Sequence, residues 1–320
     1  MSSLSQTNSP ITSFSCTSVF ATRIFKIFLL SLLVVPFAFL STSKFEPSQT
    51  GFFCDDNHLK YPYLTETVSS EVCLVIWIVL TMLVICTVEV VMSSAERNSN
   101  AGQSNAAERR PVLSNLLYSH IGCFILGLMS CLLVSEFAKY YIAKLRPYYL
   151  TLCMPVFTKD LCLDQYGYHI FIEQEEETIC QGLKNNITSK QTLDEAKLAF
   201  ISEHSCVSFF CAIFIMFYLH ERVKSFRPIN KSLRKTKLAL YIITFVTPLF
   251  GCAVSCLAFW ISFTRIKNYH NSTIDVVLGA FVGIFFDVIT ALNINNGIFT
   301  NKIDFDEEKN DDVDDWVGEI

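Results

Sequence analysis

Long apolar segments alternate with polar ones along most of this chain. The apolar stretches lie at 24–42, 72–92, 113–135, 204–220, 238–261 and 274–293, and residues 199–201 can extend the fourth. A helix needs about 20 apolar residues to cross the hydrocarbon core of a bilayer. The stretches lack the polar face that helices packed in a soluble protein would show. The pattern therefore predicts an all-α, polytopic membrane protein with six transmembrane helices.

Composition agrees with this prediction and adds a domain organisation. Of the 320 residues, 51% are hydrophobic and only 17% are charged, which is unusual for a soluble domain. The net charge of −5 is concentrated in the last segment, so it says little about partners. We expect an N-terminal cytoplasmic tail at 1–22, a six-helix membrane domain at 23–296 and an acidic cytoplasmic tail at 297–320. The first helix should remain uncleaved, because a signal peptide has a shorter apolar core.

Basic residues predict the orientation of these helices. The loop after the fourth stretch is rich in Lys and Arg between 222 and 237, and such loops stay in the cytoplasm. With six crossings, both termini are then cytoplasmic, and the loops at 43–71, 136–203 and 262–273 face outward. The second of these loops contains the acceptor triplet Asn186-Ile-Thr188, so we expect a glycoprotein modified at Asn186.

Cysteines in the outward loops lie in an oxidising environment, where disulfides form. Cys54 lies in the first loop, and Cys153, Cys162 and Cys180 lie in the second. We expect one disulfide within 153–180, but the sequence leaves the pairing open.

The run from Lys139 to Arg146 and Pro147 is the strongest chemical signal. Seven residues span about two helical turns, so both cations can share one helix face. Arg146 can bind two oxygens of a phosphate group at once, while Lys139 adds a compact charge. Pro147 then breaks the helix. The alternative is a pair of interfacial cations that extend toward lipid headgroups.

A longer stretch around this run resembles a known family. Glu136-Phe-Ala-Lys139, Leu145-Arg-Pro-Tyr-Tyr-Leu150 and the earlier segments Gly51–Asp56 and Lys60–Tyr63 are similar to the lipid phosphate phosphatases of the type-2 phosphatidic acid phosphatase superfamily. The resemblance covers about 20–300.

It implies a site formed by outward-facing loops. The implied reaction is hydrolysis of phosphatidic, lysophosphatidic and sphingoid phosphates without a metal or cofactor. It also implies roles in phospholipid metabolism and signal transduction, at the plasma membrane or alternatively in the endoplasmic reticulum or Golgi.

The second motif of that family would be Ser-Gly-His, and here it reads Ser202-Glu203-His204. By resemblance, Ser202 would bind phosphate and His204 would protonate the departing alkoxide. Glu203 replaces a glycine, and a carboxylate at that point should repel phosphate. Apart from the resemblance, His204 could simply be a histidine at a helix start.

The third motif is also altered. Thr264 and Arg265 would bind phosphate, and Asp275 would orient the nucleophile, but the nucleophile position holds Asn271. An amide cannot form a phosphoryl-enzyme intermediate. His270 is one residue early, and on a helix this displacement is a rotation of about 100° away from the phosphate. A local shift of the loop could bring His270 back.

Two main hypotheses follow. The first is a relative that binds lipid phosphates or partners with weak or lost hydrolysis, and the second is a competent phosphatase that uses a shifted His270. A channel or transporter is a third class, but no broken-helix pair supports it. We find no metal-binding spacing and no nucleic-acid motif, and the chain could form a homo-oligomer. Asp287, inside the last apolar stretch, should be a satisfied polar group of the bundle.

Overall fold

The computed structural model describes residues 28, 30–40, 50–99, 106–156, 162–163, 165–172, 180–229 and 234–295. The predicted tails at 1–22 and 297–320 lie outside these residues. The chain divides into two compact units. One unit contains residues up to Leu64, Met129–Glu203 and Tyr269–Asp275, and the other contains Thr65–Leu128, His204–Asn268 and the residues from Val276 onward. Each unit is described by itself.

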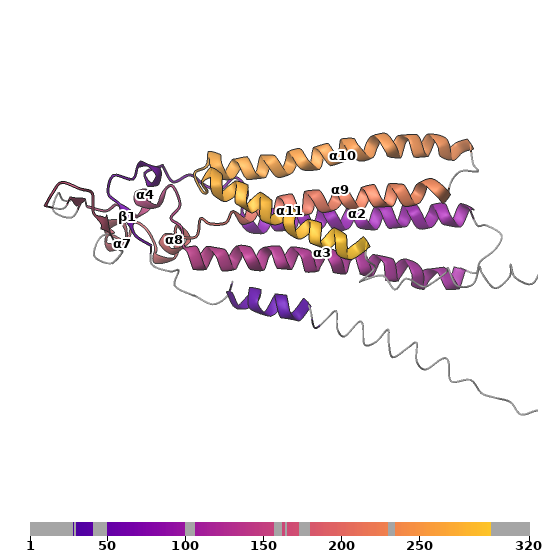
Figure 1. Ribbon diagram of the computed structural model, residues 1–320, viewed down its shortest axis with the longest axis horizontal. Coiled ribbons are helices and arrows are strands. Elements are labelled where there is room, and N and C mark those ends of the chain that lie inside the picture. Colours follow the sequence, from indigo (N-terminus) through magenta and orange to yellow (C-terminus); the bar gives the residue numbers. More distant parts are fainter. Residues whose placement is uncertain are drawn as a thin grey trace, which may run out of the picture. The chain divides into compact units, whose positions relative to one another are not determined.

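Long helices make up most of the second unit (Figure 1). Four of them are α2 (Ser70–Ser99), α9 (Glu203–Ile229), α10 (Arg234–Lys267) and α11 (Thr273–Asn295). The first part of α3 (Ala106–Ile142) belongs to the same unit. All five helices contain a segment long and apolar enough to cross a membrane, at 70–94, 117–142, 203–224, 245–267 and 273–294.

The polytopic helical architecture is therefore confirmed, and five of the six expected stretches coincide with these segments. Within the first expected stretch, 24–42, the structure describes an apolar helix over Leu30–Leu40, which is shorter than a full crossing. Six crossings and the arrangement of loops remain a prediction.

Aromatic side chains fill the interior of the helical unit. Trp77 and Phe210 are fully buried, and the Phe124 ring lies 5.9 Å from the Phe210 ring. The Trp77 indole donates a hydrogen bond of 2.9 Å to the Ser208 hydroxyl, so its polar nitrogen is satisfied in the apolar interior. These contacts join α2, α3 and α9.

The first unit surrounds a small cross-linked core. Its short elements are β1 (Phe52–Phe53), η1 (Asn57–Leu59), α4 (Tyr149–Cys153), β2 (Phe171–Ile172), α7 (Gln181–Lys184) and α8 (Lys190–Glu195). Strands β1 and β2 pair antiparallel, which adds a minimal sheet to a fold expected to be all-α. Because the elements are too short to bury much surface, covalent links contribute strongly to their stability.

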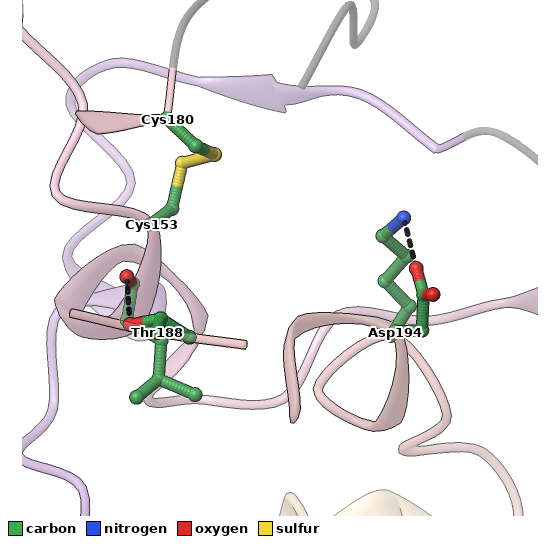
Figure 2. Close-up of a disulfide and its surroundings, with 6 residues drawn as sticks. Cys153, Cys180, Thr188 and Asp194 are labelled. Carbon is green, nitrogen blue, oxygen red and sulfur yellow. Dashed lines mark hydrogen bonds and ion pairs between the residues drawn. A yellow bond between two sulfur atoms is a disulfide. The ribbon is translucent and has the colours of Figure 1, made fainter. Parts of the chain in front are cut away.

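Two disulfides supply those links. Cys153 is bonded to Cys180, within the range that the sequence named, and Cys162 is bonded to Cys54. Figure 2 shows the Cys153–Cys180 bond, with the Thr188 hydroxyl donating to the Leu152 carbonyl at 2.9 Å close by.

Two local expectations about motif geometry were wrong. Helix α3 ends at Ile142, and Ala143 adopts a positive φ of 46°, so the helix stops well before Pro147. Arg146 therefore lies in an irregular segment after the helix and does not share a helix face with Lys139. Residues 269–272 form a turn before α11 starts at Thr273, so the helical rotation assumed between His270 and Asn271 does not apply.

Candidate functional site

Three chain segments of the first unit are held together by backbone hydrogen bonds. The Arg146 amide donates to the Ala196 carbonyl at 2.8 Å, and the Ala199 amide donates to the Lys144 carbonyl at 3.0 Å. The Ser202 amide donates to the Asp275 carbonyl at 3.2 Å. Segments 144–146, 196–202 and 271–275 thus meet although they are distant in sequence. This places residues of all three motifs in one cluster.

Arg146 contacts the histidine of the third motif. Its Nη1 lies 3.1 Å from His270 Nδ1 and 3.1 Å from the Tyr148 hydroxyl. His270 Nε2 lies 2.9 Å from the Leu64 carbonyl, which can only accept, so Nε2 carries the proton and Nδ1 accepts from Arg146. The histidine is therefore the neutral tautomer whose lone pair faces the guanidinium.

Aromatic rings fix the orientation of His270. The Tyr148 ring lies 5.1 Å from the imidazole and the Tyr63 ring 6.2 Å from it, both edge to face. The preceding residue, Tyr269, has a positive φ of 58° and stacks on Tyr61 at 4.4 Å. The turn is held in one conformation by these contacts. None of these tyrosines was singled out as a site residue from the sequence.

Lys139 is held between two carboxylates. Its ammonium lies 2.5 Å from Glu136 Oε1 and also bonds to Glu203 Oε2. The three side chains are only 13–17% exposed, so water screens these charges weakly. Glu203 was expected to repel phosphate. It also forms an ion pair with Lys139, the lysine that was expected to bind phosphate.

Among the described residues of this unit, Asp275 bonds to Lys144 and Ser272 and not to His270. Its Oδ1 accepts from Lys144 at 2.7 Å, and its Oδ2 accepts from the Ser272 amide at 2.9 Å and hydroxyl at 2.8 Å. The carboxylate is fully buried at the start of α11, where the helix dipole also stabilises its negative charge. Lys144 was missed from the sequence, although it lies within the first motif.

Asn271 and Ser202 complete the cluster. The Asn271 amide donates to the Ala199 carbonyl at 2.5 Å and is 5% exposed. Ser202 is 1% exposed, and its hydroxyl has no hydrogen-bond partner in the described part of the chain. A buried hydroxyl in that state is available to a ligand oxygen.

The positive and negative charges of this cluster balance. Lys139, Lys144 and Arg146 carry three positive charges, and three carboxylates bonded to the lysines carry three negative charges: Glu136, Glu203 and Asp275. The cluster is therefore formally neutral, not the strongly positive anion receptor that the motif lysine and arginine alone suggest.

The remaining predicted site residues belong to the other unit. His204 is 4% exposed, with Nε2 3.0 Å from the Val68 carbonyl. Arg265 is 4% exposed and bonds to Glu66 at 2.9 Å, while the Thr264 hydroxyl donates to the Ile261 carbonyl at 2.6 Å. That these three residues join the cluster around Arg146 in one site stays a prediction. Glu66 was not identified from the sequence, because it belongs to no motif.

Asn186, the predicted glycosylation acceptor, is exposed and adopts a positive φ of 54° at the end of α7. Its modification stays a prediction. No cluster of three or more His, Cys, Asp or Glu side chains suitable for a metal ion occurs among the residues described.

Comparison with known proteins identifies the family. The model of the PAP2 superfamily matches residues 120–298, more than half of the chain. The chain belongs to the PAP2 superfamily. It is 28% identical to mouse phospholipid phosphatase 1 over 87% of this chain and 86% of that protein. It is 24% identical to human phospholipid phosphatase 2 over 83% and 81%, respectively. No solved structure matches.

PAP2 membership confirms the resemblance drawn from the first motif. The matched region contains the helices α9 and α11 and the segments that form the cluster around Arg146. The relatives named above are phospholipid phosphatases, so at the level of the family the chain is linked to phosphate esters of lipids. The activity of this chain is a separate question.

Proposed function

We propose that this PAP2 protein binds phosphate monoesters of lipids at the outer leaflet, and that its hydrolytic turnover is weak or absent. The ligands would be phosphatidic, lysophosphatidic and sphingoid phosphates. Arg146 and the buried, unbonded hydroxyl of Ser202 are the groups that support phosphate binding. A guanidinium forms paired hydrogen bonds to phosphate oxygens, and a hydroxyl adds a neutral donor.

The single observation that carries weak turnover is the state of Asn271. By resemblance this residue occupies the nucleophile position, and its amide donates to the Ala199 carbonyl at 2.5 Å. An amide is not a nucleophile toward phosphorus, and this hydrogen bond directs its nitrogen at a backbone oxygen. The carboxylates bonded to Lys139 act in the same direction, because they compete with the negative charge of the transition state.

One specific contact favours a second candidate, a competent phosphatase. His270 Nδ1 lies 3.1 Å from Arg146, so a phosphate held by Arg146 would be close to an imidazole lone pair. A bound phosphate could take over the guanidinium hydrogen bond and leave Nδ1 free to attack. His270 would then serve as nucleophile without any rearrangement of a helix, since it lies in a turn.

Phosphate release from phosphatidic acid tests both candidates in full-length protein reconstituted in vesicles. The proposal expects little turnover in the wild type and a gain in the combined variant Asn271→His with Glu203→Gly. Substantial wild-type turnover that disappears in His270→Ala would establish the second candidate instead. Lys190→Gln removes an exposed positive charge from α8 of the same unit and serves as the matched control for charge.

Binding is measured separately from hydrolysis. Wild-type protein should bind vesicles containing phosphatidic acid more strongly than vesicles of phosphatidylcholine alone, and Arg146→Gln should remove that difference. Equal binding by wild type and Arg146→Gln, with Lys190→Gln unchanged, would contradict phosphate recognition by this cluster.

A further inference from the structure

Asp287 is a buried carboxyl group for which the described residues offer no hydrogen-bond partner. It lies on α11 in the helical unit, is fully buried, and neither carboxylate oxygen has a hydrogen bond to any described residue. Asp275, one helical segment earlier, is equally buried but accepts from Lys144 and Ser272. The expectation that Asp287 would be a satisfied polar group is therefore wrong.

The face of α11 that carries Asp287 is closed by tight helix packing on either side. At Gly283, one turn before, an added Cβ would lie 2.3 Å from the Cys206 carbonyl of α9. At Gly127 of α3, an added Cβ would lie 2.3 Å from the hydroxyl of Thr290, one turn after Asp287. Such close approaches require glycine, and they leave no room for a lipid chain beside the carboxyl group.

A buried thiol lies near Asp287. Cys211 of α9 is fully buried and close enough to Asp287 to interact with it electrostatically. The buried Thr81 hydroxyl of α2 donates to the Trp77 carbonyl of its own helix at 2.8 Å, and not to Asp287. No described lysine or arginine forms an ion pair with Asp287.

A second group of polar and charged side chains in this unit is bonded internally. Glu89 accepts from Arg222 and from the Tyr218 hydroxyl, and His120 lies 3.8 Å from the same carboxylate. Those side chains form their own cluster on α2, α3 and α9. They provide no bonded counter-charge for Asp287 among the described residues.

An ionised carboxylate in this position would be very costly, because an unpaired charge buried among helices loses its hydration without compensation. A metal ion is disfavoured as a counter-charge, because no group of three suitable ligands occurs in the described ranges and small cations need several oxygen ligands. A single proton removes the charge and needs no set of ligands.

We propose that Asp287 is a proton-binding site: its carboxyl group is held as the neutral acid inside the helix bundle. Deprotonation would leave an unpaired charge and would draw water or a cation into the helix bundle. Because α11 also begins with the residues around Asp275, loss of the proton would disturb a helix that carries the third motif. This inference does not depend on whether the protein hydrolyses phosphate.

Infrared difference spectroscopy tests the protonation state directly. The spectrum of full-length wild type minus Asp287→Asn, recorded in vesicles at neutral pH, should contain the carbonyl band of a carboxylic acid that shifts in deuterated water. A difference spectrum that contains only carboxylate bands would overturn the proposal.

Two further measurements distinguish a proton from a cation. Addition of sodium at constant pH should leave the acid carbonyl band of Asp287 unchanged. Loss of that band on addition of sodium would show that a cation binds at Asp287 and would contradict the proposal. Asp287→Asn should keep the wild-type melting temperature within a few degrees, whereas a loss as large as that of Asp275→Asn would indicate a charged group.

Discussion

Replacement of Glu203 by glutamine should strengthen the binding of lipid phosphates. Glu203 bonds to the ammonium of Lys139, which is the lysine of the first motif. In the wild type, a phosphate that approaches Lys139 must displace this carboxylate or share the lysine with it. Glutamine keeps the size of the side chain but removes the competing charge.

The magnitude follows from the burial of the pair. The Lys139 and Glu203 side chains are 13% and 17% exposed, so their bond belongs to the charge-assisted class worth about 1.5–3 kcal/mol. Glu136 still bonds to Lys139 in the variant and retains part of the competition. We therefore take the lower end, about 1.5 kcal/mol, which corresponds to about tenfold tighter binding.

Calorimetric titration of purified full-length protein with short-chain phosphatidic acid provides the assay, with phosphate release followed in parallel. Glu71→Gln, which removes an exposed carboxylate at the start of α2, is the matched control and should bind like the wild type. The reasoning fails if Glu203→Gln binds no more tightly than Glu71→Gln. It also fails if the double variant Glu203→Gln with Arg146→Gln binds as tightly as Glu203→Gln alone. The phosphate would then bind away from Arg146.

Three further predictions concern stability and modification. Replacing both Cys153 and Cys180 by serine removes a disulfide that closes a loop of 27 residues. In a denaturant titration this should lower the free energy of unfolding by about 3.5 kcal/mol. The control Cys86→Ser, at an exposed free thiol, should have little effect. Arg222→Gln leaves Glu89 buried without its main partner and should cost about 3 kcal/mol, and adding Glu89→Gln should restore most of it; a double variant as unstable as the single one would refute the pairing argument. Asn186→Gln should abolish a glycosidase-sensitive band on a gel, and a band that persists would place the glycan at another site.

The helices and the family could be predicted from the sequence, because both depend on local patterns. Apolar stretches determine where a chain can cross a bilayer, and five of them became helices of sufficient length. The first motif is a contiguous run, so its resemblance to the family needed no knowledge of distant contacts. Errors arose where a helix was assumed to continue. Ala143 already leaves the helical conformation, so the face-sharing argument for Lys139 and Arg146 failed.

The partners within the site could not be predicted, since they depend on which segments meet. Lys144 lies between the two cations of the first motif and was assigned no role from the sequence. It bonds to Asp275, the carboxylate that was expected to orient the nucleophile. Glu136 appeared only as part of a family string, although it holds Lys139. Pairings of this kind join distant residues: Lys144 and Asp275 are 131 positions apart, and His270 and Leu64 are 206 positions apart. No local periodicity encodes them.

The replaced residues of the second and third motifs form a coherent set when their bonds are considered together. Glu203 supplies a carboxylate to Lys139, and Asn271 supplies an amide to a backbone carbonyl. Each change removes a function expected by resemblance and adds a bond within the protein. A site that had only lost catalytic residues would leave buried cations unpaired, at a cost of several kcal/mol. Here the two lysines, Lys139 and Lys144, are paired internally, so a phosphate ligand must compete for them with the carboxylates of the protein. Affinity for lipid phosphates should therefore depend on Glu203 as much as on the cations of the motif.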